Sequence, residues 1–247
     1  MIRRFFIKST REYVKLQIDT LPDDLAEKKG EFVTIVYHGS KEKNLIPIVN
    51  GGREGNDFGK GFYCTFDPEL AKEWAVAEYT EGNYSFLYSY QIDLSLLNIF
   101  EFSDIKKWLA EVLYNNKTLD KLRKDQNEDL NNFLLKHHNI ITDCDAIIGN
   151  RADDYLYRYL RDFVRGNLDF NSIQKILENN YLGEQICFKS ENAIQLINNG
   201  AIKPIQLTKE EQINYYSSYK EKFNNFANEY DNLIILPREK RKYIFDL

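Results

Sequence analysis

A glycine-rich segment between two apolar runs constrains the fold of this 247-residue chain more than any other feature. Residues 50–61, NGGREGNDFGKG, contain five of the 12 glycines, so their backbone must adopt conformations or approach other groups in ways that side chains would prevent. The β-branched and aromatic run FVTIVY at 32–37 predicts a buried strand that ends at the tripeptide HGS, 38–40. The segment FYCT at 62–65 predicts a second, short strand. We therefore expect a loop held between two strands that lie side by side.

The rest of the chain predicts a mixed α+β domain. Apolar runs predict strands, and segments of helical spacing, several of them opening at a capping residue, predict helices. We expect one domain at 32–206 with a helical insertion at about 103–138, an N-terminal appendage at 1–31 and a C-terminal helical extension at 207–247. The expected strands are 84–93, 144–149 and 183–190, and the expected helices are 68–79, 103–116, 118–138, 153–166, 170–180, 190–200 and 208–231.

Composition excludes several classes of protein. The net charge of -5 gives no basic excess of the kind that a nucleic-acid binder usually shows. Cys64, Cys144 and Cys187 are odd in number and far apart, so we expect neither a disulfide framework nor a zinc site, and no metal cofactor. No run is long and apolar enough for a membrane span or a secretory signal. We expect a cytoplasmic protein without a membrane partner.

Two common phosphate-binding motifs do not fit the glycine-rich segment. A Walker loop would need Gly where Glu54 stands, and Ser or Thr where Gly61 stands. A Rossmann fingerprint opens a helix after a strand, whereas these glycines lead into a strand. The segment therefore calls for a different explanation.

The two strand motifs resemble a known family. YHGS at 37–40 and DFGKGFY at 57–63, followed by a helix that contains Ala71, Trp74 and Ala75, are similar to the NAD-binding half of ADP-ribosyltransferases of the poly(ADP-ribose) polymerase and diphtheria-toxin type. The bacterial ADP-ribosyltransferase-like family DUF3990 resembles the chain more closely, over roughly residues 34–200. The resemblance implies a split β-sandwich, in which two small sheets meet at an NAD cleft.

The resemblance also implies roles for individual residues. His38 would bind a ribose hydroxyl of the adenosine, and the backbone of Gly39 would pair with the nicotinamide carboxamide. Tyr63 would stack on the nicotinamide ring. Arg53 and, less selectively, Lys60 would meet the diphosphate. The remaining residues expected at NAD are Ser40, Asp57, Phe58, Gly59, Gly61 and Thr65. For Asp57, ordering of the loop through bonds to backbone is an equally good interpretation.

The family type also has a carboxylate that bonds the nicotinamide ribose and favours the positive charge of the transition state. Alignment with the polymerase pattern selects Glu184 for this role, whereas alignment with DUF3990 relatives selects Gln185. Neighbouring residues of a strand point to opposite faces, so only one of them can face the ribose without a bulge. If Gln185 faces it, the charge is lost.

Several other polar residues have an ordinary structural interpretation. Asp153 and Asp154 are expected to cap the helix that follows them. His137 and His138 end a predicted helix and are expected at the surface. Cys187 has no basic neighbour in the sequence, so we expect a buried thiol and not a nucleophile.

The resemblance predicts a mono-ADP-ribosyltransferase that takes NAD+ as substrate and passes ADP-ribose to a macromolecule. A protein acceptor is slightly favoured, and a nucleic acid stays open. Small bacterial relatives of this type resemble toxins with a neutralising partner, so a cognate antitoxin is a further expectation. The alternatives are an NAD+ glycohydrolase that uses the same pocket and a non-catalytic NAD-binding module.

Overall fold

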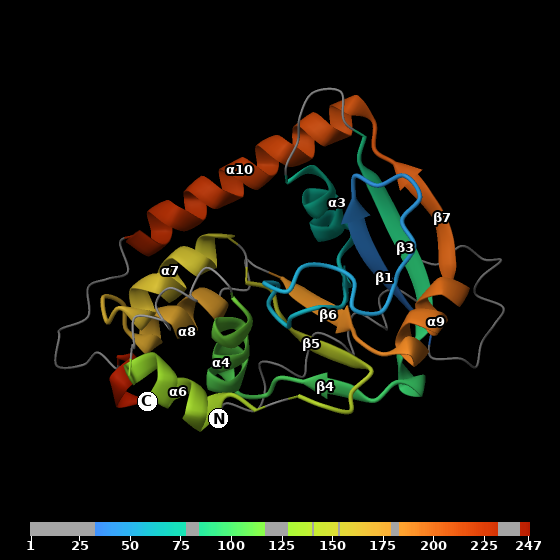
Figure 1. Cartoon of the computed structure of the whole chain (residues 1–247). Coiled ribbons are helices and arrows are strands. Elements are labelled where there is room, and N and C mark those ends of the chain that lie inside the picture. The colour runs from blue at the N-terminus through green and yellow to red at the C-terminus, as the bar shows by residue number, and fades with distance from the viewer. Residues whose placement is uncertain are drawn as a thin grey trace.

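The computed structural model describes residues 33–77, 84–116, 128–139, 141–152, 154–178, 183–231 and 243–247 (Figure 1). The expected N-terminal appendage at 1–31 lies outside these residues. Within them the chain is a mixed α/β protein with one seven-stranded sheet, in the order β4-β5-β6-β2-β1-β3-β7. The strands are β1 (Val33–Ser40), β2 (Phe62–Thr65), β3 (Phe86–Asp93), β4 (Ile99–Glu101), β5 (Ala146–Asn150), β6 (Glu184–Phe188) and β7 (Ala201–Gln206).

One continuous sheet stands where two small sheets were expected, but its continuity depends on one narrow junction. β1 pairs with β3 over all eight of its residues, whereas it pairs with β2 only at Tyr37 and Thr65. Beyond that pair the two strands diverge. The strand also runs through His38, Gly39 and Ser40, where it was expected to end, because each of them pairs with a residue of β3.

Within the described residues the helices lie where the sequence predicts them, and the part of the predicted 118–138 helix that precedes Glu128 lies outside the description. Asp67 caps α3 (Pro68–Val76) by accepting a hydrogen bond from the amide of Glu69, and Ser190 caps α9 (Glu191–Asn199) in the same manner. The two pieces of the 103–138 insertion are α4 (Ile105–Asn115) and α6 (Glu128–His137), and α4 is capped by Asp104. The other helices are α7 (Asp154–Val164), α8 (Phe170–Glu178) and α10 (Lys209–Asp231). Asp153 and the side chain of Asp154 lie outside the description.

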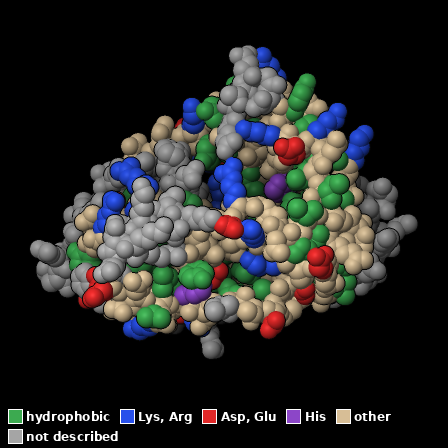
Figure 2. All heavy atoms as spheres, viewed as in Figure 1, with side chains coloured by type: hydrophobic (Ala, Val, Ile, Leu, Met, Phe, Trp, Pro, Cys, Tyr) green, Lys and Arg blue, Asp and Glu red, His purple; other side chains and the backbone are tan. Residues whose placement is uncertain are grey.

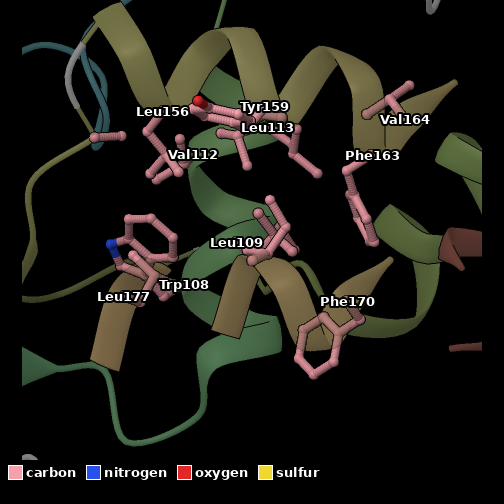
Figure 3. Packing of buried hydrophobic residues seen from close by; sticks show 14 of the residues in the cluster. Trp108, Leu109, Val112, Leu113, Leu156, Tyr159, Phe163, Val164, Phe170 and Leu177 are labelled. Carbon is pink, nitrogen blue, oxygen red and sulfur yellow. The ribbon is translucent and has the colours of Figure 1, made fainter. Parts of the chain in front are cut away.

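The sheet separates two hydrophobic cores. On one face, α4, α6, α7 and α8 enclose a large cluster that includes Trp108, Leu109 and Phe163 (Figure 3). On the other face, α9 packs on the sheet through Ala193, Ile194 and Ile197. Alternate residues of β6 serve the two cores: Cys187 faces the first, and Ile186 and Phe188 face the second. A strand buried on both faces reads as a continuous apolar run, which is why CDAIIG and QICF stand out in the sequence.

The start of the C-terminal extension packs on the domain. Tyr215 and Tyr216 of α10 lie against a small buried cluster that contains Ala75 and Val76 of α3. The Lys222 ammonium pairs with the buried carboxylate of Glu73 on α3. The first part of α10 is therefore an integral layer over α3. No helix among the described residues is both long enough and apolar enough to cross a membrane.

Candidate active site

The two motif strands meet at His38. Its Nδ1 lies 2.6 Å from the carbonyl oxygen of Tyr63, at the point where β1 and β2 diverge, and its ring centroid lies 4.8 Å from that of Phe62. Because a carbonyl only accepts, Nδ1 carries the proton, and the neutral ring presents Nε2 as an acceptor. Burial lowers the pKa of His38. The histidine is therefore neutral near neutral pH.

Gly39 is required by packing as well as by any ligand. A Cβ at this position would lie 1.8 Å from the carbonyl oxygen of Ala71 and 2.6 Å from the amide nitrogen of Ala75, both backbone atoms of α3. The resemblance attributes this glycine to nicotinamide binding. The structure adds a second reason, since only a glycine lets α3 approach β1 this closely, and the small residues of α3 serve the same close approach.

The glycine-rich loop is tied to β2 by the phenol of Tyr63. Its hydroxyl donates to the carbonyl of Gly59 over 2.7 Å and accepts from the amide of Phe58 over 3.0 Å. Burial raises the pKa of Tyr63 well above its usual value, so the phenol stays protonated. At Gly61 a Cβ would lie 2.3 Å from the Sγ of Cys187. The predicted stacking residue therefore also anchors the end of the loop.

Asp57 is the most enclosed polar group of the loop, with 5% of its surface exposed. One oxygen accepts from the amide of Ala152 over 2.7 Å and from Nε2 of Gln185 over 2.5 Å, and the other accepts from the hydroxyl of Tyr157. Burial raises the pKa of Asp57 to about 6, although these donors and the charge of Arg151 oppose the rise. At neutral pH the carboxyl is mostly ionised.

Gln185, and not Glu184, lies on the face of the sheet that holds Asp57 and its hydrogen-bond partners. Gln185 pairs in register with Thr65 of β2, which in turn pairs with Tyr37 of β1, so the three side chains form one row across three strands. Gln185 is 4% exposed and bonds Asp57. Glu184 is directed to the opposite face, and its carbonyl accepts from the hydroxyl of Thr65 over 2.9 Å.

The row lies between two helical groups on the same face of the sheet. α3 covers Gly39 on one side, and the large core covers Cys187 on the other. The guanidinium of Arg151, just after β5, lies 5.6 Å from the ring centroid of Trp74 on α3. The buried indole nitrogen of Trp74 has no hydrogen-bond partner among the residues described. In the space-filling view, Lys and Arg side chains border a hollow on the visible face near the end of β1 (Figure 2).

Comparison with protein families gives one match. Residues 34–199 match the family described as "Protein of unknown function (DUF3990)". The chain belongs to the DUF3990 family. No curated protein and no solved structure shows a significant match. The predicted resemblance to DUF3990 is therefore confirmed, with nearly the predicted bounds.

The remaining predicted site residues of the DUF3990 domain differ widely in exposure. Arg53 and Lys60 are exposed, and Lys60 pairs with Glu54 over 3.2 Å. The hydroxyl of Ser40 accepts from the amide of Glu42. Phe58 is 1% exposed and packs between Tyr63 and Phe102, so its side chain belongs to the core. Gly59 has a positive φ of 72° and lies against Asn115.

A second polar cluster supports the loop from α4 and α6. His138, which was expected at the surface, is instead enclosed: its Nε2 lies 3.1 Å from Oε2 of Glu111, and its ring stacks on Tyr114. Asn115 bonds both Glu111 and the carbonyl of Asp57. The chain folds α6 back onto α4, which helical periodicity alone does not reveal. Among the described residues, no cluster of His, Cys, Asp and Glu is arranged to hold a metal ion.

Sequence reasoning missed three residues of the site. Tyr157 and Ala152 hold the carboxylate of Asp57, and Arg151 lies against Trp74. All three come from the segment that follows β5, where neither of the two motifs lies. Cys187 is buried as expected, and burial raises the pKa of its thiol to about 12.

Proposed function

We propose that this DUF3990 protein is an NAD+-consuming mono-ADP-ribosyltransferase. The observation that carries the proposal is the contact of His38 with Tyr63, which joins the two motif strands 25 residues apart in sequence. The resemblance assigns the side chain of His38 to a ribose hydroxyl of the adenosine and the ring of Tyr63 to the nicotinamide, and the bond from His38 to the Tyr63 backbone brings the two positions together. On this proposal the sheet is a variant of the split sandwich, in which β1, β3 and β7 form one half and the other four strands form the second.

The reaction breaks the bond between C1′ of the ribose and the nicotinamide nitrogen. The bonding electron pair leaves with the nitrogen, so the pyridinium becomes neutral nicotinamide and C1′ becomes an oxocarbenium-like centre. A nucleophilic atom of the acceptor then bonds C1′ and gives up its proton. Nε2 of His38 accepts from a ribose hydroxyl, and the ring of Tyr63 lies against the nicotinamide. Arg151 and the exposed Arg53 offer positive charge for the diphosphate.

The acceptor is a macromolecule, with protein slightly favoured over nucleic acid. The small bacterial relatives that the chain resembles look like toxins with a neutralising partner. We therefore also propose that it acts as a bacterial toxin, held in check by a cognate antitoxin. These parts of the proposal rest on the resemblance alone.

One observation favours a second candidate function. A neutral amide, Gln185, occupies the row where ADP-ribosyltransferases of this type have a carboxylate. Loss of that charge favours an NAD-binding module without catalysis, or slow hydrolysis by water. The three possibilities release different products, so one experiment separates them.

The experiment is incubation of the full chain with NAD+ that carries separate labels on nicotinamide and on adenine, with and without bacterial lysate. A transferase releases nicotinamide and labels a macromolecule, a glycohydrolase releases free ADP-ribose, and a binding module only raises the melting temperature. His38→Ala should lose the activity, while Lys203→Ala on the exposed edge strand β7 serves as the matched control. The absence of both nicotinamide release and thermal shift would overturn the proposal.

A further inference from the structure

The candidate site holds a buried carboxylate one hydrogen bond away from the amide that replaces the expected glutamate. Nε2 of Gln185 lies 2.5 Å from Oδ2 of Asp57, although the two residues are 128 positions apart. Asp57 comes from the loop and Gln185 from β6. The negative charge that this face of β6 lacks is therefore present at the site, carried by a different element.

Asp57 also determines which way the amide of Gln185 points. An ionised carboxylate only accepts, so it holds the Nε2 end of the amide and turns Oε1 away. Nε2 lies 3.4 Å from the carbonyl of Asn150 as well. Among the described residues, none donates to Oε1 of Gln185. A side chain that is only 4% exposed thus keeps one acceptor for a ligand.

The hydrogen-bond partners of Asp57 treat its carboxyl group as an acceptor. The amide of Ala152 and the hydroxyl of Tyr157 both donate to it, and neither group is cationic. Arg151 is the cation that acts on it, and no ion pair joins the two within the described residues. The charge of Asp57 is therefore free to polarise the amide that it holds.

We propose that Asp57 is a positioning residue that orients and polarises Gln185, so that the amide oxygen does the work of the missing carboxylate. Oε1 of Gln185 accepts from a hydroxyl of the nicotinamide ribose, and the charge of Asp57 strengthens that acceptor as C1′ becomes positive. No proton moves between the two side chains. The proposal rests on the proposed NAD+ cleavage. In it Asp57 acts through Gln185 and does not bind NAD+ itself.

Asp57→Asn tests this because it removes the charge and keeps the shape. The asparagine Oδ1 can accept from Ala152 and Gln185, while its Nδ2 faces Tyr157, whose hydroxyl can turn and accept. We expect kcat for nicotinamide release to fall roughly 10- to 100-fold with little change in KM, since only a transition-state interaction is weakened. An unchanged kcat in a folded Asp57→Asn protein would overturn the inference while leaving the proposed function in place.

A double-mutant cycle tests whether Asp57 acts through Gln185. Gln185→Ala should lower kcat on its own, and adding Asp57→Asn to it should lower kcat no further. Two full and additive losses would show that Asp57 acts elsewhere, and would contradict the proposal.

Tyr157→Phe keeps the test valid if Asp57→Asn does not fold. This change removes one donor to the carboxylate, so Asp57 should take up its proton at higher pH, and the acid limb of the kcat profile should move to higher pH. An acid limb that stays in place contradicts the inference. If the wild-type protein neither releases nicotinamide nor shows a thermal shift with NAD+, the proposed function itself is wrong. Failure of the inference about Asp57 and failure of the proposed function therefore give different results.

Discussion

The two ends of the glycine-rich loop are held in different ways. Between Gly51 and Asn56 the backbone closes local turns, and Arg53 and Glu54 lie in solvent. From Asp57 onward Lys60 alone is exposed, Asp57 and Phe58 are buried, and Asp57 bonds elements far away in the sequence. The buried end is therefore built into the sheet, whereas the exposed end is available to adapt to a ligand. The changes below should affect the two ends unequally.

The largest difference in stability between the two ends should come from adding one methyl group at each end. In Gly61→Ala the new Cβ would lie 2.3 Å from Sγ of Cys187 and 2.9 Å from the carbonyl of Phe188, so β2 and β6 must move apart. We expect a loss of about 3 kcal/mol or more in the free energy of unfolding. In Gly51→Ala the nearest atoms are 3.1 and 3.3 Å away, in Ile48, and the loss should stay within about 1 kcal/mol. Urea unfolding of both variants measures the difference, and equal losses would contradict the comparison.

Removal of the central side chain at each end should give the next largest contrast. Asp57→Ala leaves the amide of Ala152 and Nε2 of Gln185 without an acceptor, although it also removes a buried charge. We expect a net loss of about 2 kcal/mol. Arg53→Ala should change the stability by less than about 0.5 kcal/mol, because the side chain is exposed. Thermal unfolding monitored by circular dichroism measures the two changes in stability. An Asp57→Ala protein as stable as the wild type would mean that this carboxylate does not hold the buried end.

The sequence predicted the backbone of the site better than its contacts. The strands that carry YHGS and GKGFY were found because their apolar and aromatic runs are strong signals, and their adjacency followed from the loop between them. β4 and β7 were missed. β4 has three residues and pairs only with β5, and β7 contains Pro204 where the pairing with β3 shifts register, on an exposed edge that tolerates proline.

The contact between Asp57 and Gln185 was beyond the reach of local patterns. Each residue was singled out separately, but the register that aligns β6 with β2 places them together, and register depends on the whole sheet. The same register decides between Glu184 and Gln185, since a shift by one residue would exchange their faces. Tyr157 and Ala152 had no signal at all, because their role depends entirely on where Asp57 lies.

Changes in pH should act on activity and on stability in opposite directions at the buried end. The pKa of Asp57 is raised from the usual 3.8 to about 6 by burial, so its charge, and the proposed activity, is lost as the pH falls through about 6. The folded state binds this proton more tightly than the unfolded chain, so the same protonation stabilises the fold, by up to roughly 3 kcal/mol between these pKa values. In the part of the chain that the structure describes, the ionisable groups that face Asp57 are Arg151, Tyr63, Tyr157 and Cys187.

The measurement is kcat for nicotinamide release and the melting temperature over the same pH range. If the proposed activity holds, His38 should contribute a second acid limb, because its protonation would remove the Nε2 acceptor. Asp57→Asn should remove the limb near 6 and leave that of His38, whose pKa burial lowers. A profile that Asp57→Asn does not change would mean that His38 alone sets the acid limb.

The smallest effect should come from the exposed cations of the loop, Arg53 in its exposed end and Lys60 close to Gly61. Arg53→Ala and Lys60→Ala each remove a solvated cation, and Lys60 already pairs with Glu54 in the free protein. Because exposed charges are screened, we expect KM for NAD+ to rise only about two- to fivefold at low salt, with kcat unchanged. The rise should vanish as salt is added, because the contribution of these residues to binding is electrostatic. A fall in kcat in either variant would place these exposed cations in the reaction itself and would remove the distinction between the exposed and the buried side chains of the loop, since only the buried ones should influence the step in which the bond breaks.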